Sequence, residues 1–398
     1  FGTATNSGTL LISAPANTQI TTTTARPAEL VYGNGRAVFT DGTNFDWLTT
    51  ASTGAPFTLT GLVSASAISV TGGSTASTTT ITLPAPIAVA TSSTTAASAI
   101  VSTANTTGLV VGMGVSGAGI PAGASIASIN PGVSFTLTVN ATATGTGLTL
   151  NAGGTSGFVS GMYVTGTGIP ANATIASVTN GTTMVISAAA TATGTGVTIG
   201  AVGYLPLPNN GSSVGTVNYS LSASQTQNTA ASAVGTLKIS NPAASQTLNL
   251  ATFDLAFGST TGGLLVTGTN AVTVAGGGTG SALTAGVVNT AGSLFLHQYN
   301  TNSPLVVSAN IVNNGTGALT VVKSGPGTVV LSGANTYTGG LVVNAGEVRL
   351  GSAGMGAAAN VVTLNGGTLV ANAGTTAFTL AQLNGLNTAT LLLRDTSA

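Results

Sequence analysis

Charged residues and cysteine are the scarcest components of this 398-residue sequence. There is no cysteine, so disulfide bonds and thiolate metal sites are excluded. Six lysines and arginines balance six aspartates and glutamates, and together they make up 3% of the chain, against about a quarter in an ordinary soluble domain. The sequence therefore offers no basic face that would bind nucleic acid or anionic lipid.

Long apolar runs and helical periodicity are also lacking. No apolar run reaches the ~18–20 residues that a membrane-spanning helix needs, so we expect no transmembrane segment. Short stretches of alternating apolar and polar residues fill the chain instead, separated by glycine (57 residues), asparagine and proline. This pattern predicts an all-β protein. The chain opens at Phe1 without a leader, which favours a processed product or a fragment of a longer protein.

The clearest pattern lies between Lys323 and Leu350. Successive side chains of a strand point to opposite faces, so Val348 and Leu350 share one face while Glu347 and Arg349 share the other. A similar pattern returns 21 positions later, where Asn-Gly-Gly-Thr-Leu at 365–369 lines up with Asn-Ala-Gly-Glu-Val at 344–348. A short repeat with one inward apolar stripe per strand predicts a β-solenoid, in which coils stack on one another.

Asparagines mark the corners of this repeat. The segment that begins at Asn344 lines up with the one that begins at Asn365, and Asn335 ends an earlier strand. Stacked coils bring equivalent side chains together, so we expect these asparagines to form hydrogen-bonded ladders between coils.

The same stretch resembles the autotransporter-associated β-strand repeat of bacterial surface proteins. The residues that carry the resemblance are Gly-Pro-Gly-Thr-Val-Val-Leu-Ser-Gly-Ala-Asn-Thr-Tyr-Thr-Gly-Gly at 325–340 and Val-Val-Asn-Ala-Gly at 342–346. The strict resemblance is confined to this stretch, and a looser one runs from Leu237 to the end of the chain. It implies a β-helical, passenger-type segment on the cell exterior, and it brings no catalytic residue with it.

A second repeat lies in the first half of the chain. Gly-Leu-Val-Val-Gly-Met-Gly-Val-Ser-Gly-Ala-Gly-Ile-Pro at 108–121 recurs with substitutions, as Gly-Phe-Val-Ser-Gly-Met-Tyr-Val-Thr-Gly-Thr-Gly-Ile-Pro at 157–170, displaced by 49 positions. Each copy contains four or five short alternating runs with glycine or proline turns between them. We therefore predict two small antiparallel β-modules, each a compact barrel or sandwich.

These patterns predict a β-solenoid with two inserted modules. We expect an N-terminal β segment that begins the solenoid at 1–94, the modules at 95–151 and 152–202, a linker with return strands at 203–236, and the main solenoid at 237–398. The alternative is a string of separate domains with an independent N-terminal one.

One loop holds candidate metal ligands. Asp41, Asn44 and Asp46 supply two carboxylates and an amide oxygen, which are the ligands that calcium prefers. The same residue types are also common in ordinary turns, and further ligands are lacking in this loop. Calcium is thus the single cofactor for which the sequence gives a candidate.

Catalytic residues are scarce. His297 is the sole histidine, Asp254 is the acid nearest to it in sequence, and no serine lies in a nucleophile elbow. The acids of the solenoid part, Asp254, Glu347 and Asp395, are far apart in sequence, which disfavours two-carboxylate chemistry. We expect a protein that is not an enzyme.

The sequence therefore favours an extracellular structural protein that assembles with copies of itself into a surface filament or layer, because near-zero net charge favours association. Residues 3–24 contain β-forming residues, and they are a candidate strand for donation to a neighbouring subunit or a cap of their own domain. The alternative is a monomeric adhesin or passenger stalk at the bacterial cell surface. Its paired modules would bind a surface glycan or a host or matrix ligand.

Overall fold

A computed structural model describes residues 10–13, 21–22, 37–40, 45–50, 57–61, 68–74, 76–211, 213, 215, 217–228, 231–241, 243–258, 261–276, 280–351, 360–372, 382–385 and 389–394. These residues form strands and turns, and none of them belongs to a helix that could cross a bilayer. The chain divides into two compact units. The first unit comprises Phe1–Leu10, Gly33–Ala37 and Pro206–Ala398, and the second comprises Leu11–Tyr32 and Val38–Leu205.

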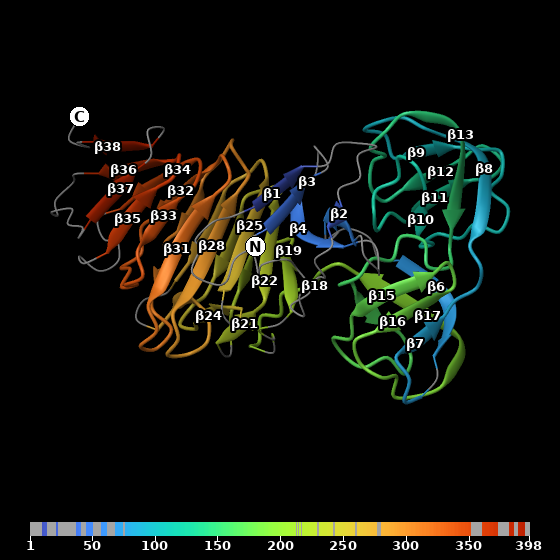
Figure 1. Ribbon diagram of the computed structural model, residues 1–398, viewed down its shortest axis with the longest axis horizontal. Coiled ribbons are helices and arrows are strands. Elements are labelled where there is room, and N and C mark those ends of the chain that lie inside the picture. Colours follow the sequence, from blue (N-terminus) through green and yellow to red (C-terminus); the bar gives the residue numbers. More distant parts are fainter. Residues whose placement is uncertain are drawn as a thin grey trace. The chain divides into compact units, whose positions relative to one another are not determined.

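The first unit contains a parallel β-solenoid with three sheets (Figure 1). The first sheet consists, in order, of β18 (Leu205–Pro206), β19 (Asn218–Leu221), β22 (Thr236–Asn241), β25 (Thr261–Gly268), β28 (Gly292–Gln298), β31 (Leu319–Ser324), β33 (Leu341–Val343), β35 (Val361–Leu364) and β37 (Gln382–Gly385). The second sheet consists of β20 (Gln225–Thr226), β23 (Gln246–Asn249), β26 (Val272–Ala275), β29 (Leu305–Val307), β32 (Thr328–Leu331), β34 (Glu347–Leu350), β36 (Thr368–Asn372) and β38 (Thr390–Arg394). The third sheet consists of β21 (Ser232–Val234), β24 (Leu255–Phe257), β27 (Ala282–Ala285) and β30 (Asn310–Ile311).

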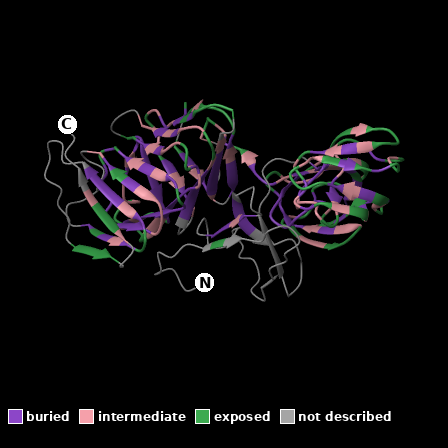
Figure 2. Ribbon diagram, turned by 90° about the horizontal axis from the view of Figure 1, so that it is seen from above, coloured by how far each residue is buried: buried purple, intermediate pink, exposed green. Residues whose placement is uncertain are grey.

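The predicted register of the solenoid is confirmed. Val348 pairs with Leu369 in the neighbouring parallel strand, and both side chains are fully buried. Val343 pairs in the same way with Leu364, so equivalent positions of these coils are separated by 21 in the sequence, as Asn344 and Asn365 are. Buried residues run along the inner faces of the sheets from coil to coil (Figure 2). The core of the solenoid is therefore built from stacked apolar columns.

The solenoid becomes narrower at the repeat that contains Tyr337. Leu294 of β28 pairs with Val321 of β31, and Val321 pairs with Leu341 of β33. The coil from Val321 to Leu341 therefore contains fewer residues than the coil from Leu294 to Val321. The third sheet ends at β30, and a turn takes its place in the next coil. There the Asn335 side-chain oxygen accepts a hydrogen bond from the Ile311 backbone N–H at 2.7 Å.

Tyr337 fills the interior of this shortened coil. Its side chain is fully buried, and its carbonyl oxygen accepts a hydrogen bond from the Asn360 side-chain amide at 2.9 Å. Burial raises the pKa of its hydroxyl. Within the described part of the chain that hydroxyl has no hydrogen-bond partner. The aromatic ring thus replaces the volume of a third strand, while the hydroxyl adds an unsatisfied polar group.

The second unit begins with an antiparallel sheet. Its order is β1 (Leu10–Ser13), β3 (Ala37–Thr40), β4 (Phe45–Thr50), β5 (Phe57–Gly61) and β2 (Thr21–Thr22), of which β1 and β3 straddle the boundary between the units. The described pairs of this sheet are antiparallel, for example Thr40 with Phe45. Antiparallel strands can be joined by short hairpin turns, whereas parallel strands of a solenoid need a long connection between them. The described strands of 1–61 therefore differ from the solenoid start that the sequence favoured.

Two six-stranded antiparallel sheets follow, one for each predicted module. Module 1 consists of β8 (Ile87–Thr94), β9 (Ile100–Ser102), β10 (Val115–Ser116), β11 (Ile126–Asn130), β12 (Ser134–Leu137) and β13 (Gly145–Ala152). Module 2 consists of β6 (Ile68–Ser74), β7 (Thr80–Thr82), β14 (Tyr163–Thr165), β15 (Ile175–Asn180), β16 (Thr183–Ile186) and β17 (Gly194–Val202). Module 1 thus lies in sequence between β7 and β14 of module 2.

This nesting divides the chain differently from the ranges 95–151 and 152–202. The β6–β7 hairpin pairs with β16 and β17 of module 2, and β8–β9 pairs in the same way inside module 1. The β6–β7 and β8–β9 hairpins share only an alternating pattern of apolar and polar residues. Strand β8 also has an additional residue near Thr91, whose backbone φ is 53°. The repeat therefore extends further toward the N-terminus than the identical residues alone indicate.

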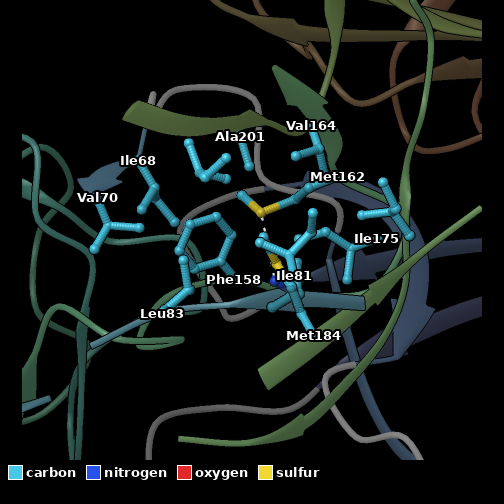
Figure 3. Close-up of a cluster of buried hydrophobic side chains, with 13 residues drawn as sticks. Ile68, Val70, Ile81, Leu83, Phe158, Met162, Val164, Ile175, Met184 and Ala201 are labelled. Atoms are coloured by element: carbon cyan, nitrogen blue, oxygen red, sulfur yellow. Dashed lines mark hydrogen bonds between the residues drawn. The ribbon is translucent and has the colours of Figure 1, made fainter. Parts of the chain in front are cut away.

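The core of module 2 draws on both parts of its divided sequence. Ile68 and Leu83 come from before module 1, and they pack with Phe158, Met162 and Met184 from after it (Figure 3). Ala122 of module 1 packs against the same cluster. Module 2 is therefore complete only when the chain has passed through module 1 and returned.

Placing a charge at an inward position of the solenoid tests its register. Val348→Asp should prevent folding of the repeat, because an unpaired buried carboxylate costs several kcal/mol. The control is Val330→Asp, which introduces the same charge on the outward face beside its pairing partner Arg349. Circular dichroism and thermal unfolding should show lost structure only for Val348→Asp. An unchanged melting temperature for that variant would contradict the register.

Two substitutions of Tyr337 separate its ring from its hydroxyl. Tyr337→Phe should raise the free energy of unfolding by about 1 kcal/mol, because it removes an unsatisfied buried hydroxyl and keeps the ring. Tyr337→Ala should lower it by about 3–5 kcal/mol, because it leaves a cavity in the shortened coil. Urea unfolding of both variants measures these changes. Equal losses in the two variants would mean that the hydroxyl has a hydrogen-bond partner.

Candidate functional site

The candidate calcium loop is only partly described. Asp41 and Asn44 lie outside the described residues, whereas Asp46 is buried on β4. The Tyr204 hydroxyl donates a hydrogen bond to the Asp46 carboxylate at 3.1 Å, and the backbone N–H of Trp47 donates to the Tyr204 oxygen at 3.4 Å. Burial, and then the charge of Asp46, raise the pKa of Tyr204 well above its ordinary value. The described part of this loop thus anchors Tyr204, and the calcium site stays a prediction.

His297 and Asp254 occupy different sheets of the solenoid. The His297 ring is buried on the first sheet between Phe295 and Tyr299, with ring centroids 6.3 and 6.5 Å away. Asp254 is exposed just before β24 of the third sheet, and its carboxylate accepts a hydrogen bond from the Ala282 backbone N–H at 2.9 Å. The histidine thus belongs to an aromatic row, and the aspartate connects two coils.

The remaining charged groups of the repeat are also structural. Glu347 and Arg349, which share the outward face of β34 as predicted, form an ion pair. Asp395 lies outside the described residues. Among the residues that the structure describes, no three histidines or acids gather into a group that would hold a metal ion.

The asparagine ladder forms at one of the predicted corners. The Asn365 side-chain amide donates to the Asn344 side-chain oxygen at 2.8 Å, and the Asn344 amide donates to the Ser324 hydroxyl at 3.3 Å. Each bond joins one coil to the next. Asn335 does not join this ladder, because its side-chain oxygen bonds the Ile311 backbone instead.

Lys323 is the most unusual residue of the repeat. It occupies an inward position of β31, in register with Leu296 and Val343, and its side chain is fully buried. Its amino nitrogen lies 2.7 to 3.1 Å from the backbone oxygens of Ser324, Gly325 and Ala345. The Ala345 oxygen belongs to the following coil, so the lysine ties two coils together.

Two features of the surroundings of Lys323 have opposite effects on the protonation of its amino group. Three acceptors match the three N–H bonds of an ammonium group, whereas burial lowers the pKa of the group to about 7. Close packing around Lys323 also explains why residue 346 is a glycine, because a Cβ at that position would lie 2.8 Å from the lysine nitrogen. The sequence contained a signal for this site: Val321 and Lys323 are two positions apart and therefore share the inward face of a strand.

The stability of the solenoid should depend on pH through Lys323. Near pH 7 the folded protein releases a proton that the unfolded chain keeps until about pH 10.4, so the free energy of unfolding should rise with pH between these values. The slope is at most about 1.4 kcal/mol per pH unit. Lys323→Met should remove it. Chemical unfolding between pH 7 and 9 tests this, since Tyr299, whose pKa burial raises to about 12, acts in the opposite direction only above about pH 10.

The control for this measurement is Arg349→Met. It removes an exposed cation that lies outside the apolar column, so the slope should stay as in the unmodified protein. A flat profile in the unmodified protein, or an equal slope in Lys323→Met, would contradict the assignment to Lys323.

A comparison with known protein families identifies the part of the chain around Lys323. Residues 321–350, which run from within β31 to the end of β34, match the family model of the passenger-associated transport repeat. No curated protein and no solved structure matches the chain. The resemblance that the sequence suggested is thereby confirmed for this segment: the solenoid carries a passenger-associated transport repeat at residues 321–350.

Proposed function

We propose that this chain is a passenger-type stalk on the exterior of a bacterial cell, and that it displays the paired modules without catalysing a reaction. The observation that carries the proposal is the position of the matched repeat. Residues 321–350 pair on both sides with neighbouring coils, through β28 and β29 before and β35 and β36 after. The repeat is thus one step in a longer stack, as a folding unit of a stalk would be.

The uses of the polar side chains support a role without catalysis. Lys323 and Asn344 link coils, Asp254 bonds the backbone of Ala282, and Glu347 is paired with Arg349. A general acid or base needs a group within reach of a bound substrate and a second group that assists it. Lys323, Asn344 and Asp254 are thus occupied in holding coils together, and Glu347 is paired within its own strand.

Module 1 is the better candidate for contact with a ligand. Its Val110 is 57% exposed, whereas the equivalent Val159 of module 2 is only 3% exposed. Both residues occupy the same turn, because the Met113 and Met162 backbone N–H groups donate to their carbonyl oxygens in the same way. Val111 and Val133 of module 1 are exposed as well. Exposed apolar side chains of this kind suit contact with a matrix protein or the apolar face of a sugar.

A second candidate is assembly into a filament or layer. The observation that favours it is the small number of charges, twelve among 398 residues with net charge zero, because little electrostatic repulsion keeps copies apart. Donation of residues 3–24 to a neighbouring copy would be one route to such an assembly.

Sedimentation separates the two candidates. For a stalk, the full chain should sediment at its monomer mass of 37.9 kDa across a hundredfold range of concentration, because its function needs no contact between copies. For a filament, the mass should grow with concentration, and electron microscopy of the same sample should reveal regular polymers. Growth into polymers would overturn the stalk proposal.

A further inference from the structure

The two modules contact each other through different surfaces of the same fold. The turn face of module 2 comprises Ser156, Gly157 and Val159. The glycine face of module 1 comprises Gly112, Gly114, Ala122 and Ala124. A Cβ on Gly157 would lie only 2.9 Å from the Ala124 carbonyl oxygen. Beside this contact, the Ser69 backbone N–H of module 2 donates to the Gly112 carbonyl oxygen at 2.8 Å. Unlike faces of equivalent modules thus meet, and a heterologous contact of this kind can be repeated from one module to the next.

Gly114 sets the condition for this contact. A Cβ at that position would overlap the Ser156 carbonyl oxygen of module 2 and would lie 3.2 Å from the Ile68 side chain. The backbone φ of Gly114 lies outside the left-handed region, so the lack of space alone requires glycine here. Module 2 has Tyr163 at the equivalent position, 49 residues later, and the tyrosine is buried. Module 1 therefore has a glycine face and module 2 has none.

The turn face is buried in module 2 and open in module 1. Ser156 and Val159 of module 2 are 8% and 3% exposed. Their equivalents in module 1 are Thr107, which is exposed, and Val110, which is 57% exposed. Ala122 of module 1 packs against the cluster that contains Val159, so the contact between the modules contributes to this difference. Module 1 thus presents a surface whose counterpart in module 2 is already an interface.

The path of the chain indicates where a further module belongs. Thr82 of module 2 and Ser102 of module 1 are equivalent, because their pairing partners, Thr183 and Ser134, are 49 positions apart. Counting on from them, residues 85–153, which contain module 1, are inserted in module 2 at the place that corresponds to the Ala104–Asn105 bond of module 1. That bond is the equivalent insertion point next to the open turn face.

Charge plays no part in the contact between the modules. No lysine, arginine, aspartate or glutamate lies between Asp46 and Lys238, so neither module has a charged side chain. Recognition of the turn face therefore depends on shape, apolar contact and backbone hydrogen bonds. A partner that matches it needs small residues where its backbone approaches closely, as the glycine face provides.

We propose that the turn face of module 1 is a docking surface for a further β-module of the same type, which belongs to another polypeptide and presents a glycine face. This module covers Val110 as module 1 covers Val159. A second copy of the present chain lacks a free glycine face, because the one on its module 1 is occupied by its own module 2. The proposal names the partner of module 1, and it rests on the proposed display of the modules.

Cysteine labelling tests the proposal, because the chain has no cysteine of its own. Val110→Cys should react rapidly with a maleimide in the full chain, with a phosphine reductant present to prevent disulfides. An extended chain supplies the partner module: a second copy of residues 85–153, with valine kept at its position 110, is inserted at the Ala104–Asn105 bond. In the extended chain the same thiol should react about tenfold more slowly, because the contact must open first.

Two controls accompany this measurement. Gly114→Tyr in the inserted copy alone reproduces the tyrosine that module 2 has at Tyr163, and it should restore the fast reaction of the Val110→Cys thiol. Val288→Cys, at a position of the solenoid that is 61% exposed, should react equally in every chain. Folding of the inserted copy is verified separately with Val101→Cys in that copy, since Val101 is fully buried in module 1 and the thiol should be protected.

Four results would overturn the proposal. The first is fast reaction of the Val110→Cys thiol in the extended chain. The second is equal protection with and without Gly114→Tyr. The third is an inserted copy that does not fold, because the junction and face would then not accommodate a module. The fourth is protection in the unextended chain that increases with its concentration, because a second copy would then be the occupant. Polymers on sedimentation with a reactive Val110→Cys thiol would instead contradict the stalk function alone.

Discussion

Parallel stacking of equivalent residues is the constraint on which the solenoid depends. Each inward residue lies on its counterpart one coil earlier, as the buried Leu369 does on the buried Val348. A charge at such a position is costly, because nothing in an apolar column compensates it. The near-absence of charge in this chain is therefore a consequence of its architecture as well as of its surface.

The passenger-associated repeat combines two local departures from that rule. Lys323 brings an amino group into the column, where three backbone oxygens from two coils receive it. Tyr337 fills the interior at the point where the third sheet ends and the coil shortens. Both residues stabilise the contact between successive coils. This accounts for the motif as a structural one and agrees with the absence of clustered acids or histidines from the described residues.

The two modules and the first sheet of the solenoid relate distant parts of the sequence to one another. Module 2 closes only after the chain has passed through module 1, so neither half of its core is complete alone. In the solenoid, Phe295, Val322 and Val342 likewise come from three successive coils and form one buried apolar row. Folding of both units therefore depends on contacts between residues far apart in sequence, which form slowly because long loops must close first.

The sequence by itself determined the all-β class, the register that pairs Val348 with Leu369, the ladder of Asn344 with Asn365, and the passenger repeat. These follow from patterns that are local or strictly periodic, and the alternation of side chains along a strand suffices to specify them. Only the tertiary structure decided that module 1 lies within module 2, that Asn335 bonds Ile311, and that outward side chains of the first sheet are buried. Each of these depends on which distant strand becomes a neighbour, and alternation along a single strand carries no information about that choice.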